Sequence, residues 1–416
     1  MTSVNTVTVE KHSKAYIINS GLIFTFFAIL FTFQKNFYFT ATILLITSLF
    51  FIPKYFKSIL AAPTAFPTWL LVTSLLLFLD LNTRDKGGEY LIERPIFLLS
   101  LIPIYYNISK LGFNIKALIF GLIIATIYGG LYGYYLAEIK GLGRAWGTSL
   151  NPILFGNLGA FLLVFTLSRF FYLISVATSS KMELLVTAIS IMCALLIVWS
   201  SGSRGPILTL ALLTAVFTVY FKLYKSWKFY TTALVISISA MGYYYSFPNH
   251  LINQRLTSAA IQVLNENENV DNSTTLRLAM WATSVEMAKD NLIFGSGYVK
   301  HEALYLEAIE NLGMENVGIS HFKQHHSDFF NLLAYYGLTG LFIYISLLSL
   351  LIFTYINSRN LLTFDLQTLF LGHIVCFIGV GLTDASVLKI NGSAILMVPA
   401  TIFLGYINYK KSIQPT

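Results

Sequence analysis

Long apolar segments follow one another along almost the whole chain, and most are separated only by short polar connections. Hydrophobic residues make up 56% of the 416 residues, charged residues only 11%, and the mean hydropathy is +0.69. A soluble domain carries about 25% charged residues, so this chain is predicted to be an integral membrane protein. The apolar runs are continuous and do not alternate with polar residues, which favours membrane-spanning helices over strands.

About twelve segments are long enough to cross, or nearly cross, a bilayer. The predicted fold is therefore a single all-α polytopic membrane domain over residues 1–416. One large loop, residues 248–327, separates the ninth segment from the tenth and is expected to contain short helices, one of them over 275–289. The twelve segments lie at about 15–33, 38–53, 65–82, 95–107, 114–136, 153–177, 182–200, 206–221, 229–247, 329–356, 366–382 and 392–408.

Basic residues are sorted between the two sides of the predicted membrane. With the N-terminus inside, the inner connections and both tails carry more Lys and Arg than the short outer connections, as the positive-inside rule requires. Both termini are then expected in the cytoplasm, with the large loop on the outer side. The inner set is mostly Lys, whereas six of the eight Arg fall outside. Because Arg binds phosphate through two parallel hydrogen bonds, the outer side is predicted to be the functional side.

The charge distribution and the cysteine content argue against nucleic-acid binding and against a disulfide framework. The net charge of +8 is distributed in ones and twos beside apolar segments, as in loops that face anionic head groups, so nucleic-acid binding is not expected. The two cysteines, Cys193 and Cys376, both lie within apolar runs, and no disulfide framework is implied.

Two outer arginines lie in sequence contexts suited to binding an anion. Arg204, preceded by Ser203, lies in the Ser-Gly-Ser-Arg-Gly-Pro stretch that ends the seventh segment, where glycines allow close approach of a ligand and Pro206 can start a helix. Arg277 and Trp281 are four residues apart on the expected helix and share a face. An interfacial arginine that only reaches lipid head groups is the alternative for Arg204 alone.

A histidine-rich stretch, residues 321–328, directly precedes the tenth segment. Histidine is suited to removing a proton from a sugar hydroxyl near neutral pH, so His325 and His326 are candidate general bases. His321, His325 and Asp328 are an alternative metal-ligand set, although no further ligand completes it. Ser327 or Asp328 can also cap the following helix.

Three weaker candidates lie at the outer ends of other segments. Asp384, at the end of the eleventh segment, is placed to orient a histidine or to pair with an arginine, although a solvated carboxylate is an alternative. Arg94 and Arg144 add positive charge to the outer connections.

Taken in order, these motifs resemble the O-antigen ligase family within the wider group of bacterial glycosyltransferases that use polyprenyl-diphosphate donors. The resemblance covers nearly the whole chain and rests on the stretches 151–156, 203–205, 276–281, 326–340 and 381–384. Each motif is short, and the assignment comes from their order, spacing and common side. Matching the spacing back from the paired glycines at the end of the 326–340 motif assigns His326 to the family histidine.

The resemblance implies an enzyme of the bacterial inner membrane with its active site in the periplasm. It would move a glycan from undecaprenyl diphosphate to a hydroxyl of the lipid A core, with inversion and with neither a metal nor another cofactor. His326 would be the catalytic base, and Arg204 and Arg277 would bind the donor diphosphate. The expected supporting residues are His325, Asp384, Arg144, Arg94, Trp281 and Ser203.

Three other functions compete with ligation. An O-antigen polymerase uses the same donor and a second lipid-linked glycan as acceptor, so the arginines do not separate the two activities. A protein O-glycosyltransferase of this group has a larger outer domain. A lipid transporter would place charged residues near mid-membrane, whereas the arginines and histidines here gather at one face.

Overall fold

The computed structural model is built of helices, and the part of the chain that it describes contains no β-strand. Among the described residues, six helices are long and apolar enough to cross a membrane, and four shorter apolar helices accompany them. The predicted class of all-α membrane protein is confirmed, while the number of twelve spans stays a prediction. The structure describes residues 14–31, 41–51, 53, 64–84, 93–146, 151–175, 180–222, 273–289, 291–322 and 324–413, with isolated positions between 225 and 246.

The first eight predicted segments all appear as helices whose ends lie within a few residues of the expected ones. The fourth is longer than the predicted 95–107, because Glu93 and Pro95 are both favourable in a first helical turn and the helix continues to Leu111. The helices are α1 (Lys14–Ala28), a short helix Ala41–Phe51, α3 (Ala65–Arg84), α4 (Glu93–Leu111), α5 (Ile115–Tyr134), α6 (Pro152–Ser175), α7 (Lys181–Ser201) and α8 (Gly205–Tyr220).

The C-terminal part contains two shorter helices followed by three long ones. The expected helix over 275–289 is present and begins two residues earlier, at Ser273. The predicted ninth segment, 229–247, and residues 248–272 of the predicted loop lie almost entirely outside the described residues. The helices are α11 (Ser273–Lys289), α12 (His301–Asn311), α13 (Asp328–Ser358), α14 (Phe364–Thr383) and α15 (Ile390–Ile413).

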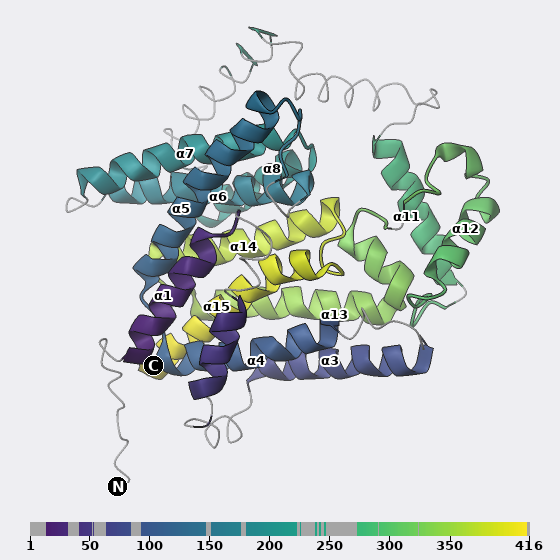
Figure 1. The fold of residues 1–416 in the computed structure, drawn as a ribbon, viewed down its shortest axis with the longest axis horizontal. Coiled ribbons are helices and arrows are strands. Elements are labelled where there is room, and N and C mark those ends of the chain that lie inside the picture. The colour runs from purple at the N-terminus through teal and green to yellow at the C-terminus, as the bar shows by residue number, and fades with distance from the viewer. Residues whose placement is uncertain are drawn as a thin grey trace.

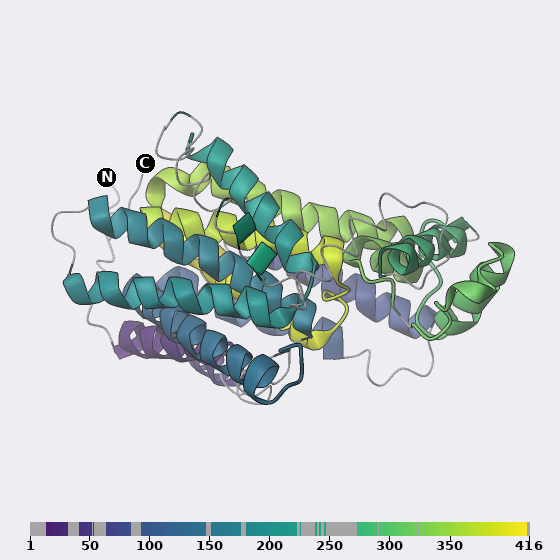
Figure 2. The same ribbon diagram turned by 90° about the horizontal axis from the view of Figure 1, so that it is seen from above.

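Most of the long helices run along the longest axis of the molecule, α5 crosses it obliquely, and α11 and α12 lie together at one end (Figures 1 and 2). We call this the α11/α12 end. At the opposite end, the start of α1 and the end of α15 meet the connection between α4 and α5. There the Asn19 side chain donates to the Gly112 carbonyl at 3.2 Å, and the Tyr409 ring lies against Gly112. The chain therefore enters and leaves the bundle at the end remote from α11 and α12.

A buried arginine joins three helices at that remote end. Arg169 of α6 is 5% exposed and makes ion pairs with Glu183 of α7 and, at 2.7 Å, with Asp365 of α14. Charged side chains within a membrane bundle are costly unless they are paired. The two carboxylates satisfy this requirement and fix the register of three helices.

α13 is interrupted at Gly337, whose φ of 59° and ψ of −151° are open only to glycine. The segment that follows α11 packs directly on this break, so that a Cβ atom at Gly337 would lie 2.4 Å from the Leu292 carbonyl oxygen. Backbone hydrogen bonds satisfy the interrupted helix: Leu338 donates to Leu292 at 2.8 Å, and Ser296 donates to Ala334 at 2.8 Å. The break thus joins the α11–α12 unit to the start of α13.

Candidate functional site

A cavity of about 310 Å³ opens at the α11/α12 end of the bundle. Three arginines and one histidine face it, together with a serine and four apolar side chains. Its lining comes from the α5–α6 connection, the α7–α8 turn, α6, α11 and the segment before α13. The lining residues are Arg144, Ile153, Ser203, Arg204, Leu276, Arg277, Met280, Phe322 and His326.

The turn between α7 and α8 has the geometry that its sequence predicts. Gly202 adopts the left-handed conformation, with φ 54°, and its N–H donates to the Trp199 carbonyl at 3.1 Å, which ends α7. Arg204 follows as the N-cap residue of α8, and Pro206 occupies the first turn. This short reversal places Arg204 on the cavity wall.

Arg144 reaches the same turn from the α5–α6 connection. Its Nη2 atom donates to Ser203 Oγ at 2.8 Å, and its Nε atom donates to the Ser201 carbonyl at 3.4 Å. The backbone N–H of Ala145 adds a hydrogen bond to the Ser200 carbonyl at 2.7 Å. Ser203 therefore orients Arg144, and two chain segments far apart in sequence form one wall of the cavity.

Arg277 contributes the third guanidinium, from α11. Burial lowers the pKa of Arg277 from the ordinary value for arginine, the nearby carboxylate of Asp384 opposes this effect, and the positive charge of Arg204 adds to it. Burial also lowers the pKa of Arg204. Both groups stay charged at neutral pH, because the ordinary pKa of arginine lies far above neutral pH. Two partly desolvated positive charges near each other favour binding of a multivalent anion.

His326 lies on a strained turn that α11 holds in place. Its φ of 47° is in the left-handed region, which a non-glycine residue adopts at a cost. Two hydrogen bonds fix the residue before it: Trp281 Nε1 donates to the His325 carbonyl at 3.1 Å, and His325 Nδ1 lies 2.9 Å from the Met280 carbonyl. His325 is fully buried and does not line the cavity, whereas His326 does.

Asp384 lies beside His326 and is itself held by two donors. One carboxylate oxygen, Oδ1, is 3.8 Å from His326 Nδ1. The other, Oδ2, accepts hydrogen bonds from Asn151 Nδ2 at 2.5 Å and Ser386 Oγ at 2.8 Å. Asp384 is 1% exposed, so the unshared Oδ1 is directed at the imidazole in a site with little solvent.

The surroundings keep the His326 imidazole neutral near pH 7. Burial is the largest effect and lowers its pKa from the ordinary 6.5; Asp384 acts in the opposite direction, while Arg277 and Lys389 lower the pKa further. A neutral imidazole whose Nδ1 faces a carboxylate has its other nitrogen, Nε2, available as a proton acceptor. The cavity therefore combines groups that can bind an anion with a group that can accept a proton.

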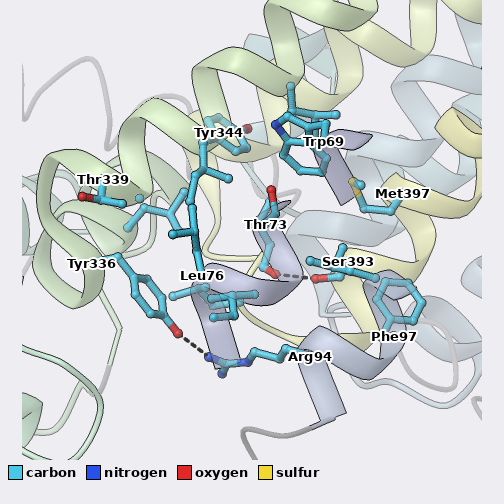
Figure 3. Close-up of a pocket in the computed structure, with 18 of the residues that line it drawn as sticks. Trp69, Thr73, Leu76, Arg94, Phe97, Tyr336, Thr339, Tyr344, Ser393 and Met397 are labelled. Atoms are coloured by element: carbon cyan, nitrogen blue, oxygen red, sulfur yellow. Dashed lines mark hydrogen bonds between the residues drawn. The ribbon is translucent and has the colours of Figure 1, made fainter. Parts of the chain in front are cut away.

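Arg94 is the one predicted site residue placed in a different cavity. It lies at the start of α4, where its Nη1 atom donates to the Tyr336 hydroxyl at 3.2 Å and its guanidinium lies 5.7 Å from the centre of the Tyr298 ring. It lines a second, apolar cavity between α3 and α13 (Figure 3). The prediction that Arg94 supports the same site as Arg204 does not match this placement, because sequence order gives no information on which helices are neighbours.

The described residues contain no group of three or more His, Cys, Asp or Glu side chains arranged to hold a metal ion. The alternative set of His321, His325 and Asp328 is not brought together as ligands. His325 Nδ1 is bound to a backbone carbonyl, and Asp328 Oδ1 accepts a hydrogen bond from the Val387 N–H at 2.7 Å.

Asn151 and Met280 belong to the site and were not singled out individually in the sequence. Asn151 lies in a motif of the α5–α6 connection, and its position directly before Pro152 was the available signal. The Met280 carbonyl lies within hydrogen-bond distance of His325 Nδ1, and Met280 also lines the cavity. Nothing in the local pattern distinguishes this Met from the other apolar residues of α11.

The fold and the cavity define a helical membrane protein with an arginine-lined cavity and a histidine–carboxylate pair. Residues 188–345 match a family model described as O-antigen ligase, and members of that family are glycosyltransferase-like enzymes. The matched segment includes Arg204, Arg277 and His326, while Arg144 and Asp384 lie outside it. No curated protein matches the chain.

Proposed function

We propose that the protein is an O-antigen ligase, which transfers a glycan from undecaprenyl diphosphate to a sugar hydroxyl of the lipid A core. The observation that carries this proposal is the convergence of Arg204, Arg277 and His326 on one cavity, although they come from three separate segments of the chain. A base and an anion clamp in one cavity are what a transfer from a diphosphate donor requires.

In this reaction His326 Nε2 takes the proton of the acceptor hydroxyl while Asp384 stabilises the imidazolium that forms. The acceptor oxygen forms a bond to the anomeric carbon, and the bond from that carbon to the diphosphate oxygen breaks, with inversion. Arg204 and Arg277 bind the diphosphate and stabilise the charge that develops as it leaves. Because a diphosphate is already a good leaving group, two guanidinium groups can take the place of a divalent cation.

We further propose that the cavity faces the periplasm from the inner membrane and that both termini are cytoplasmic. The placement of α1 and α15 supports this topology, since the chain enters and leaves the bundle at the end remote from the cavity. Residues 248–327 are then a periplasmic loop whose described part forms the α11–α12 unit. Labelling of single cysteines at positions 204, 277 and 326 from the periplasm tests this proposal, and labelling from opposite sides contradicts it.

The direct test uses purified protein, a lipid-linked glycan donor and lipid A core, with excess chelator. We expect transfer of the glycan to lipid A core by the wild type and none by His326→Ala, which should still bind donor. A requirement for added metal would contradict the metal-independent mechanism. Movement of lipid without bond formation would indicate a transporter.

A gene-deletion strain separates ligation from polymerisation. If the protein is a ligase, the deletion removes all polymer from lipid A, and lipid-linked polymer accumulates until the wild-type gene is restored. A deletion strain that still carries one repeat unit on lipid A would show instead that the protein is a polymerase. A complementing His326→Ala gene should leave the deletion phenotype unchanged.

A further inference from the structure

A second cavity, of about 390 Å³, lies between α3, α4, α13 and α15 and shares no lining residue with the arginine cavity. We call it the α3/α13 groove. Its wall is almost wholly apolar, and Figure 3 shows side chains from these helices turned toward one space. Its floor includes the buried residues Tyr344 and Leu347 of α13, whereas Leu76 and Leu79 of α3, 39% and 59% exposed, form an open rim.

Two polar contacts hold the groove open by fixing the helices on either side. Trp69 Nε1 donates to Ser346 Oγ at 2.8 Å and joins α3 to α13 at one end. At the other end Arg94 of α4 donates to the Tyr336 hydroxyl of α13. Between these contacts α3 packs mainly on α4 and only sparsely on α13. The space is therefore part of the folded protein and is bounded at both ends.

The length of the groove matches one leaflet of a bilayer. Its α3 wall runs from Trp69 to Leu79, ten residues along the helix, which is about 15 Å at 1.5 Å per residue. The hydrocarbon core of a bilayer is about 30 Å thick, so this is about half of it. Such dimensions fit a single hydrocarbon chain that enters from one leaflet.

A positive charge marks the end of the groove that lies toward α11 and α12. Arg94 lies there, near Asn291 and Phe294 of the segment that follows α11. The partners described for Arg94 are the two tyrosines Tyr336 and Tyr298, neither of which neutralises its charge. An apolar groove with a guanidinium at its outer end is complementary to a lipid with an anionic head group.

The groove and the arginine cavity lie on either side of the segment Asp384–Lys389. Asp384 faces His326 of the cavity, and Val387, three residues on, lines the groove. The Val387 N–H donates to Asp328 Oδ1 at 2.7 Å, which fixes this segment to the start of α13. A molecule in the groove therefore lies next to the segment that carries Asp384, the carboxylate beside His326.

We propose that the α3/α13 groove binds an acyl chain of the acceptor, a phosphorylated and acylated glycolipid, with Arg94 on its phosphate. This rests on the proposed ligase function. In an inverting transfer the acceptor oxygen attacks the anomeric carbon from the face opposite to the leaving diphosphate. With the diphosphate on the arginines, the acceptor needs a separate site, and the groove is a second cavity next to the segment of Asp384.

The binding test is photo-crosslinking of the full-length protein in lipid nanodiscs, which needs no turnover. The probes are lipid A core, polyprenyl diphosphate and phosphatidylglycerol, each with a diazirine on a hydrocarbon chain. We expect the lipid A probe to label peptides from 69–79 and 339–347, with competition by unlabelled lipid A core. Labelling of these peptides by polyprenyl diphosphate instead, or equal labelling by phosphatidylglycerol without competition by lipid A core, would overturn the assignment.

Substitution of two adjacent leucines provides a variant with a filled groove and a matched control. Leu76→Trp puts an indole into the groove, whereas Leu75→Trp, at a position that is 53% exposed and outside the lining, does not. We expect Leu76→Trp to raise the acceptor KM about tenfold, equivalent to about two methylene groups of lost burial, with the donor KM unchanged. Leu75→Trp should behave as wild type. An unchanged acceptor KM in Leu76→Trp, with lipid A labelling also intact, would contradict the proposal.

A deacylated core oligosaccharide distinguishes this proposal from the proposed function itself. Leu76→Trp and wild type should use this chain-free acceptor equally well, because it leaves the groove empty. Arg94→Gln should weaken labelling by phosphorylated lipid A more than labelling by its dephosphorylated form. If the wild type transfers glycan to no acceptor, the ligase proposal fails; if it transfers but the lipid A probe does not label the groove, only the groove assignment fails.

Discussion

Asn151 donates a 2.5 Å hydrogen bond to Asp384, and this bond determines which carboxylate oxygen faces His326. Asn151 precedes α6, Asp384 follows α14, and His326 precedes α13, so the contact joins three distant segments at the base. The bond occupies Oδ2 together with Ser386 and leaves Oδ1 for the imidazole. The geometry of the base thus depends on a residue that does not line the arginine cavity.

The first prediction concerns the pH dependence of transfer. The neutral form of His326 is the active one, so the rate falls as pH drops through its pKa, which lies below the ordinary 6.5. Asp384→Asn removes the charge that raises this pKa, so the acid limb should move to lower pH while kcat falls by about 10²-fold or more. Asn151→Ala should lower kcat less than Asp384→Asn does and should leave the acid limb of the pH–rate profile nearly unchanged. A pH–rate profile whose acid limb stays unchanged in Asp384→Asn would contradict the assigned pair.

The second prediction separates arginine from generic positive charge. Arg204→Lys and Arg277→Lys keep the charge but lose the two-pronged hydrogen bonds, so each should lower kcat/KM for the donor by about tenfold or more. Arg359→Lys, in the short helix Arg359–Leu361 after α13, is the matched control and should have no effect. Full activity in both cavity variants would mean that these arginines act only as interfacial anchors.

The third prediction compares two glycines with positive φ. Gly337 packs against the backbone of 292–295, whereas a Cβ atom at Gly313, with φ 61°, would meet no atom within 4 Å. Gly337→Ala should therefore destabilise the protein by more than about 3 kcal/mol, from backbone strain together with the collision. Gly313→Ala should cost about 1 kcal/mol, from strain alone. Thermal unfolding in detergent provides the comparison, and equal shifts in Tm would contradict the role of close packing.

The fourth prediction is an acid-sensitive α11–α12 unit. Burial lowers the pKa of His325 to about 4 and that of His301 to about 3, and the two rings pack edge to face with centroids 5.3 Å apart. Both are neutral when folded and bind a proton more readily when unfolded, so stability is complete above about pH 6.5 and falls as pH decreases toward 4. The loss is on the order of 3 kcal/mol for each histidine.

Hydrogen exchange of residues 273–320 as a function of pH measures this effect. Relative to the intrinsic amide exchange rate, which itself falls with pH, exchange should accelerate between pH 6.5 and 4 in the wild type. His301→Phe keeps the stacking on Tyr335, whose ring centroid is 3.7 Å from that of His301, and should reduce the acceleration. If exchange accelerates equally in the wild type and in His301→Phe, the histidine pair is not the cause of the acid sensitivity.

The sequence predicted the helices well because their ends carry local chemical signals. Gly202 and Pro206 mark the turn that presents Arg204, and the spacing of Arg277 and Trp281 places both on one helix. In contrast, the sequence predicts that Arg94 supports the same site as Arg204, although Arg94 lines the α3/α13 groove. Which helices become neighbours depends on packing between distant segments, and charge or spacing along the chain does not report it.

The interruption of α13 shows the same limit. Gly337 and Gly340 were noted as a pair, but membrane helices often contain glycine without a break. The break is required by the segment after α11, because this segment forms hydrogen bonds to the helix backbone on both sides of Gly337. Likewise, the number of spans depends on residues 223–272, most of which lie outside the described ranges.

α11 is anchored on α13, and this determines which cavity residues would move together if the cavity widened. Arg277 and His326 are joined through Trp281 and the 292–297 segment, so both belong to one hydrogen-bonded piece of the structure. Arg204 belongs to another piece, the α7–α8 turn, to which Arg144 is tied. Widening the cavity by rotation of the first piece separates the guanidinium of Arg277 from that of Arg204. Under the proposed function, such a rotation would weaken the binding of the diphosphate carrier after transfer.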